Sequence, residues 1–160
     1  MTGPTVLYLI KQVELAVRSH LDAVVESAGL TTQLYTALTV LERHPGITAA
    51  ELARMSFIRP QTAAQTVNAL EARDLVERIR ADEDRRRIRL VLAPRGQRVL
   101  DQLREPVAEL EERMLRAMDP EARAALRAAL VTARSALDQE PVKTSLRARC
   151  RVAGGLVRRR

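Results

Sequence analysis

The stretch from residue 48 to residue 94 constrains the fold most, because it encodes two short helices followed by a β-hairpin. It opens on Thr48-Ala49-Ala50-Glu51, a capping box in which the Thr48 hydroxyl accepts from the Glu51 amide and the Glu51 carboxylate accepts from the Thr48 amide. The apolar pattern breaks at Phe57-Ile58-Arg59. Pro60 suits the first turn of a new helix and keeps the residue before it out of the helical region. We therefore predict one helix from Thr48 and a second from Pro60.

The second of these helices has one apolar and one polar face. Ala63, Val67 and Leu70 recur at spacings of four and three and form the predicted buried face. The opposite face is polar but uncharged and carries Gln61, Thr62, Gln65, Asn68 and Ala72. Amide side chains can donate and accept at once against adenine, and threonine offers a hydroxyl and a methyl group. This face is typical of base-edge reading, although surface helices carry the same residue types merely to face water.

A β-hairpin is predicted after the helices, with strands at residues 75–80 and 88–92. In the second strand Ile88, Leu90 and Leu92 alternate with their neighbours, which predicts one buried face.

The residues between the two strands predict a wing that projects into water. They are polar or charged apart from Ala81, and they are too many for a two-residue turn. Arginine is the side chain most favoured in a narrow minor groove. The predicted DNA contacts at the tip are Arg85, Arg86 and Arg87. Asp84 lies two residues before Arg86, and we expect it to brace that arginine by an ion pair.

The order of these segments resembles the MarR family of bacterial winged helix-turn-helix repressors. The resemblance rests on Leu52-Ala53, the helix from Pro60 to Glu71, Leu75-Val76-Glu77-Arg78, Asp84-Arg85-Arg86 and Pro94-Arg95-Gly96. It extends to a first helix over residues 6–30, ending at Gly29-Leu30, and to a second over residues 31–44. Its most specific element is the wing signature formed by Asp84 and Arg86. The fold implied is mainly α with a small β-hairpin wing, a winged helix-turn-helix joined to a helical dimerisation domain.

The resemblance implies a division of the chain into three regions. Residues 1–30 and 95–140 are expected to form the helical dimerisation region, residues 31–94 the winged helix-turn-helix domain, and residues 141–160 a basic C-terminal tail. Apolar stripes at helical spacing support helix pairing in the first region. They comprise Val6, Ile10, Val13, Val17, Leu21 and Val24, then Leu103, Val107, Leu110 and Met114, and finally Leu126, Leu130, Ala133 and Leu137. Packing within one chain explains such stripes as well as a homodimer does, and the resemblance favours the homodimer.

Three positions depart from the family pattern. Asp74 stands where a glycine usually follows the recognition helix, a position typical of a left-handed cap. Arg59 and Ala93 replace hydroxyl side chains before two helices, and each replacement should cost about 1 kcal/mol of capping. None of the three lies on the helix face expected to read base edges, and Arg59 is itself a predicted DNA contact.

Positive charge is concentrated in two segments. The chain carries a net charge of +7, and residues 43–98 alone carry 12 basic and 7 acidic side chains, as expected for a lobe that faces phosphates. The tail at residues 141–160 has seven basic side chains and no acidic one. It suits an arm on DNA, a solubilising end or a membrane-surface segment.

The composition excludes several other classes of protein. No apolar run approaches the roughly 18 residues of a membrane span, and the first residues lack a signal-peptide pattern, so a cytoplasmic protein is expected. Cys150 is the single cysteine and has no metal-ligand spacing around it, so we expect no metal and no cofactor. His20 and His44 have no nucleophile or carboxylate pair in a recognisable arrangement, so an enzyme is not expected.

Two functions fit these patterns. The first is a dimeric transcriptional repressor that binds a near-palindromic operator in double-stranded DNA and is released by a small-molecule effector; the second is a winged-helix module that binds a protein and has no operator. The arginines of the wing favour the first. Relatives in the family bind aromatic anions between the dimer helices and the DNA lobe, so Tyr8 and Tyr35 are the candidate effector contacts, although each side chain also suits simple packing.

Overall fold

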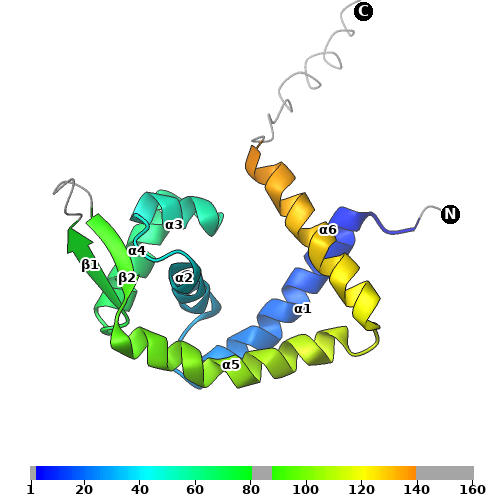
Figure 1. Ribbon diagram of the computed structural model, residues 1–160, viewed down its shortest axis with the longest axis horizontal. Helices are drawn as coiled ribbons and strands as arrows, with labels where there is room; N and C mark the ends of the chain where they lie inside the picture. The colour runs from blue at the N-terminus through cyan, green and yellow to red at the C-terminus, as the bar shows by residue number, and fades with distance from the viewer. Residues whose placement is uncertain (1–2, 81–87, 140–160) are drawn as a thin grey trace, which may run out of the picture. The chain divides into compact units, whose positions relative to one another are not determined.

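The computed structural model describes residues 3–80 and 88–139, and the chain divides into two compact units, residues 1–114 and 115–160. Figure 1 shows the elements, which in chain order are α1 (Val6–Glu26), α2 (Thr32–Arg43), α3 (Ala49–Met55), α4 (Pro60–Glu71), β1 (Val76–Arg80), β2 (Ile88–Leu92), α5 (Pro94–Leu115) and α6 (Pro120–Gln139). The second unit begins at the last residue of α5 and contains α6. The predicted fold class, mainly helical with one β-hairpin, is confirmed.

Threonine side chains start three of the helices. Thr5, Thr31 and Thr48 each accept a hydrogen bond at the side-chain oxygen from a backbone amide three residues on. At α3 the predicted capping box is present: the Glu51 amide donates to Thr48 Oγ1 at 3.3 Å, and the Thr48 amide donates to Glu51 Oε2 at 2.7 Å. The Thr48 backbone amide, followed by the Thr48 hydroxyl, which donates to the same Glu51 oxygen at 2.9 Å, lowers the pKa of the Glu51 carboxyl.

Three helices end through a residue in the left-handed conformation. Gly29, Phe57 and Asp74 have φ angles of 69°, 53° and 57°. In each case the amide of the following residue reaches back five positions to a helical carbonyl, which is the bond of a Schellman motif; at α4 the Leu75 amide donates to the Leu70 carbonyl at 3.0 Å. The left-handed conformation predicted at Asp74 is confirmed. The sequence pattern did not identify the same geometry at Phe57.

The two strands pair antiparallel, and only the base of the hairpin packs on the core. Val76 pairs with Leu92 at the base, and Arg80 pairs with Ile88 toward the tip. Leu90 is buried in the core, and its own backbone carbonyl and amide are hydrogen-bonded to Gly46 and Ile47, which precede α3. The predicted burial of the whole Ile88, Leu90 and Leu92 face is wrong at Ile88, which is 47% exposed, because the strand has passed beyond the helices at that point.

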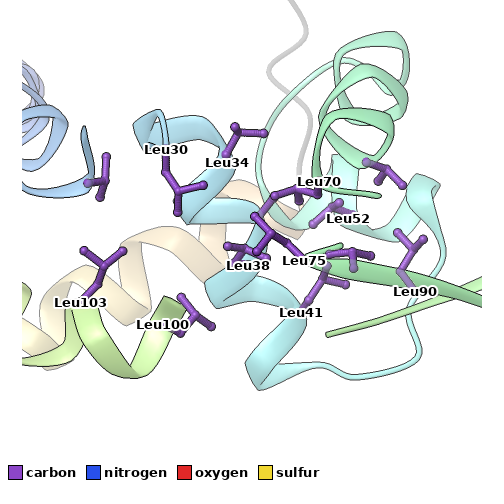
Figure 2. Packing of buried hydrophobic residues seen from close by; sticks show 14 residues of the cluster. Leu30, Leu34, Leu38, Leu41, Leu52, Leu70, Leu75, Leu90, Leu100 and Leu103 are labelled. Atoms are coloured by element: carbon purple, nitrogen blue, oxygen red, sulfur yellow. The ribbon is translucent and has the colours of Figure 1, made fainter. Parts of the chain in front are cut away.

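One leucine-rich core holds the first unit together. Figure 2 shows side chains from α2, α3, α4, the hairpin and α5 pointing toward one another. Leu38 and Leu41 of α2 lie at its centre and are fully buried, as are Leu52, Leu70 and Leu90. Burying a leucine side chain contributes on the order of 1.5–3 kcal/mol. This core fixes α4 and the hairpin relative to α2, so the surface they present to solvent has a defined shape.

The amino-terminal half of α1 is not covered by this core. Its apolar side chains are largely exposed, and they comprise Val6, Leu7, Tyr8, Leu9, Ile10 and Val13. The carboxyl-terminal part of the helix, by contrast, packs on the core through Leu21, Val24 and the buried Val25. The helix therefore carries one half that stabilises the unit and one half whose apolar surface faces solvent.

Candidate DNA-binding surface

Helix α4 presents a row of amide side chains to solvent. Ala63, Val67 and Leu70 are buried as predicted, and Gln61, Gln65 and Asn68 are exposed, as the helical spacing requires. Thr62 is half-buried. The structure thus brings the amide residues of the sequence prediction onto one surface of a helix whose other side is held rigidly by the core.

A part-buried polar contact between α2 and α4 positions this helix, and the sequence analysis missed it. Thr66 is the one polar residue among the buried side chains of the described residues, 3–80 and 88–139. Its hydroxyl donates to the Thr62 carbonyl at 2.9 Å and accepts from Gln33 Nε2 of α2 at 2.5 Å. A threonine among small apolar residues was the available signal, since a buried hydroxyl requires a partner.

The start of α4 bears a cation in place of a cap. Arg59 occupies the N-cap position in an extended conformation and makes no side-chain capping bond, and Pro60 follows it at the first helical position. The predicted loss of a cap at Arg59 is therefore confirmed. Its exposed guanidinium lies at the helix end whose amides point outward, where phosphate binding is favoured.

Arg78 of β1 joins the hairpin to α4. Its Nη2 donates to Asn68 Oδ1 at 2.5 Å, and its Nε lies 3.0 Å from Glu71 Oε2. We call these two contacts of Arg78, with Asn68 and with Glu71, the Arg78 bracket. The sequence analysis did not find it, although an arginine near the middle of the strand that follows the helix was the available signal. The bracket fixes the first strand of the hairpin to the last turns of the helix.

The tip of the wing lies outside the described residues. The predicted contacts Arg85, Arg86 and Arg87, together with the bracing residue Asp84, fall within residues 81–87 and are not placed. Arg80 and Arg89 flank that segment and are both exposed. The basic character of the hairpin thus continues onto its described part, and the roles of the four tip residues stay predictions.

A cavity lies between α1, α2 and the turn that precedes α4. Its volume is about 290 Å³, and its lining includes Glu14, Arg18, Gln33, Ser56 and Ile58. The buried Ser56 hydroxyl oxygen has no hydrogen-bond partner within the described part of the chain. Neither predicted effector residue lines this cavity: Tyr8 is 56% exposed near the start of α1. Tyr35 packs against the core, and burial raises the pKa of its phenol.

The described residues contain no cluster of three or more histidine, cysteine or acidic side chains that would hold a metal ion. None of the helices described is both long enough and apolar enough to cross a membrane. Cys150 and the basic tail lie outside residues 3–80 and 88–139.

Comparison with known proteins finds similarity to transcriptional regulators. A family model described as MarR family matches residues 28–87. An HTH-type transcriptional repressor of Mycobacterium tuberculosis is 29% identical over 108 residues, which are 68% of this chain and 78% of that protein.

Solved structures share the fold. The transcriptional regulator SlyA superposes with a TM-score of 0.77 at 19% identity, over 85% of this chain and 96% of that one. The transcriptional repressor CouR, solved with a 23-mer DNA duplex, gives a TM-score of 0.73 at 28% identity, over 81% of this chain and 92% of that one. The helix-turn-helix and the hairpin thus give the chain the fold of these solved regulators, and residues 28–87 are similar to the MarR family.

Proposed function

We propose that the protein is a transcriptional repressor that binds a near-palindromic operator, with α4 in the major groove and the wing beside it. The observation that carries this proposal is the exposed amide row of Gln61, Gln65 and Asn68 on a helix held by the core. Amide side chains suit base edges, and a basic hairpin beside them suits the phosphate backbone. The likeness to CouR, whose structure holds a DNA duplex, supports the same orientation.

The test is a titration of the purified protein against duplexes taken from the region upstream of its own gene and against a scrambled duplex. We expect tighter binding to one upstream duplex and a Gln65→Ala variant that loses this preference but keeps binding to scrambled DNA. The loss should correspond to about 1–3 kcal/mol. Glu121→Gln, a change on exposed α6 and far along the chain from α4, is the matched control. Equal affinity for all duplexes would instead favour the protein-binding module.

Binding as a homodimer is part of the proposal. Three exposed side chains of α1, Val6, Ile10 and Val13, lie on the predicted helix-pairing stripes, as do Leu130 and Leu137 of α6 in the second unit. Apolar side chains gathered at helical spacing on a surface are typical of a protein interface. A two-fold dimer would set two copies of α4 about 34 Å apart, on successive turns of the same DNA face.

The cavity beside α2 supplies a site for an effector and a route to the DNA-binding helix. Its volume is near the lower end of the roughly 300–1,000 Å³ of small-molecule sites. Gln33 lines the cavity and also donates to Thr66 of α4, so a ligand that took over the Gln33 amide would remove a hydrogen bond that positions α4. Arg18 offers a positive charge to an anion, while Glu14, 3.8 Å from Arg18, limits that attraction.

This part of the proposal has a separate test. Benzoate, salicylate and octanoate serve as aromatic and aliphatic anionic probes in a DNA titration. An effector-competent probe should weaken DNA binding by the wild type, and Gln33→Leu should reduce that response while leaving DNA binding measurable. Thr39→Val, a half-buried hydroxyl of α2 that does not line the cavity, is the control. If Gln33→Leu responds to the probe as the wild type does, Gln33 is not the link between cavity and helix.

A further inference from the structure

The Arg78 bracket determines which atoms Asn68 can present to a ligand. The Nη2 atom of Arg78 donates to Asn68 Oδ1 at 2.5 Å. Arginine has only donors, so the atom facing it is the amide oxygen and the nitrogen must point elsewhere. The orientation of the Asn68 amide is thus fixed by chemistry.

Glu71 holds the arginine in place. Asn68 and Glu71 are three residues apart and therefore lie on one face of α4. Arg78 Nε lies 3.0 Å from Glu71 Oε2, and the two side chains are 36% and 44% exposed. Planar guanidinium groups use several donors in fixed directions, so the same arginine satisfies both partners at once. The ion pair with Glu71 also opposes movement of Arg78 toward a phosphate.

The bond from Arg78 takes one of the two lone pairs of the Asn68 oxygen, so any second donor must share that oxygen with the guanidinium, whereas both N–H groups of the amide are free of this contact. A free asparagine donates to N7 and accepts from N6 of adenine, which requires both amide atoms. Within residues 3–80 and 88–139 the described hydrogen bond of the Asn68 side chain is the one that Arg78 makes to its oxygen. The exposed amide nitrogen thus offers two N–H groups to a partner that accepts.

Among the bases, guanine matches two neighbouring donors best in the major groove. Its edge presents the acceptors N7 and O6 side by side, whereas cytosine presents a donor and adenine sets a donor beside its acceptor. Thymine offers one acceptor next to a methyl group. In the adenine contact suggested by the sequence alone, the N6 donor must share the Asn68 oxygen with the Arg78 guanidinium, whereas guanine brings no donor to that oxygen.

We propose that Asn68 reads guanine, and that Arg78 is the positioning residue that sets this preference by occupying the amide oxygen. The inference rests on the proposed function, in which α4 enters the major groove. It names guanine as the base that Asn68 contacts at one position of each half-site. It also makes this preference for guanine depend on Arg78, a residue of the hairpin.

The experiment selects binding sites from a pool of randomised duplexes with the wild type, Asn68→Ala, Arg78→Met and Arg78→Lys. We expect a guanine in each half-site that Asn68→Ala no longer requires, with a loss of discrimination on the order of tenfold. Arg78→Met frees the oxygen and should admit adenine at that same position. Arg78→Lys keeps the charge without the planar fork, and it should also admit adenine.

Urea unfolding of each variant shows that it is folded before its site preference is compared. The inference is overturned if the position that depends on Asn68 is adenine in the wild type, or if Asn68→Ala relaxes no position. It is also overturned if Arg78→Met lowers affinity for every sequence equally, which would make Arg78 a phosphate contact. If the wild type selects no sequence at all, the proposed function itself fails, and this inference fails with it. That outcome is distinct from the results above, in which the wild type still selects an operator.

Discussion

At the scale of single residues, the helix-turn-helix departs from ideal chemistry at both ends of α4. The helix starts at Arg59 without a side-chain cap and ends before Asp74, which has a φ angle of 57°. A left-handed conformation costs an L-residue on the order of 1–2 kcal/mol, and aspartate tolerates it better than most. A single change at either of these two positions should therefore stabilise the domain.

Asp74→Gly should raise the free energy of unfolding by about 0.5–1 kcal/mol, because glycine adopts positive φ without a steric cost. The ion pair lost with Asp74 is small, since its carboxylate lies 3.9 Å from Arg95 and both side chains are mostly exposed. Asp74→Ala is the control, and it should lower stability because alanine lacks the local hydrogen bonding of aspartate. Urea unfolding measures both; a more stable alanine variant would contradict this explanation.

Arg59→Ser should stabilise the protein and weaken DNA binding at the same time. Serine at the N-cap can accept a bond from the amides of α4 and should add about 1 kcal/mol to the free energy of unfolding. Loss of the cation should lower the slope of log K against log salt by roughly one unit. Arg59→Ala separates the two effects, since it should weaken DNA binding equally without the gain in stability. An unchanged salt slope in both variants would show that Arg59 contacts no phosphate.

The sequence predicted individual residues well where the chemistry is local. The Thr48 and Glu51 capping box involves atoms three residues apart, so its pattern fixes its geometry. The Gln33–Thr66 and Arg78–Asn68 bonds join residues 33 and 10 positions apart. Neither can be read from spacing, because the tertiary fold decides which polar groups meet.

At the scale of elements, the base of the hairpin and the start of α5 pack backbone against backbone. A methyl group added to Gly96 would lie 2.1 Å from the Leu75 carbonyl oxygen, closer than any two such atoms approach. The same carbonyl accepts from the Ala93 amide at 3.1 Å. The Pro94-Arg95-Gly96 segment thus has a packing reason for its glycine.

Gly96→Ala should lower the free energy of unfolding by about 1–3 kcal/mol, because α5 must move away from β1 to admit the new methyl group. Gly3→Ala is the matched control, since an added methyl group there meets nothing within 4 Å. Thermal unfolding followed by circular dichroism compares the two variants. Equal melting temperatures would show that the junction is flexible enough to absorb a side chain.

The order of elements was predictable from the sequence, whereas the depth to which the hairpin is buried was not. Alternation of Ile88, Leu90 and Leu92 identifies a strand, but burial depends on what covers each position. Leu90 belongs to the core and bonds to the segment before α3, whereas Ile88, toward the tip of the hairpin, lies outside the core. Strand length relative to the core is a tertiary property.

At the scale of the whole molecule, the exposed apolar half of α1 predicts that association and DNA binding are linked. Ile10→Glu and Val13→Glu place a charge on the predicted interface without touching the core, since these residues are 42% and 52% exposed. We expect each variant to sediment as a monomer at micromolar concentration and to bind a full operator more weakly. Gln12→Glu, on another side of the same helix, should remain a dimer. Dimeric glutamate variants would place the interface elsewhere.

The two backbone hydrogen bonds between Leu90 and the segment before α3 determine how this part of the molecule unfolds locally. The Gly46 amide donates to the Leu90 carbonyl at 2.9 Å, and the Leu90 amide donates to the Ile47 carbonyl at 2.8 Å. Amide exchange at these two sites requires the wing base and the lead into the helix-turn-helix to separate together. Hydrogen exchange should therefore find Gly46 and Leu90 leaving as one cooperative unit, with the same opening free energy and the same response to denaturant.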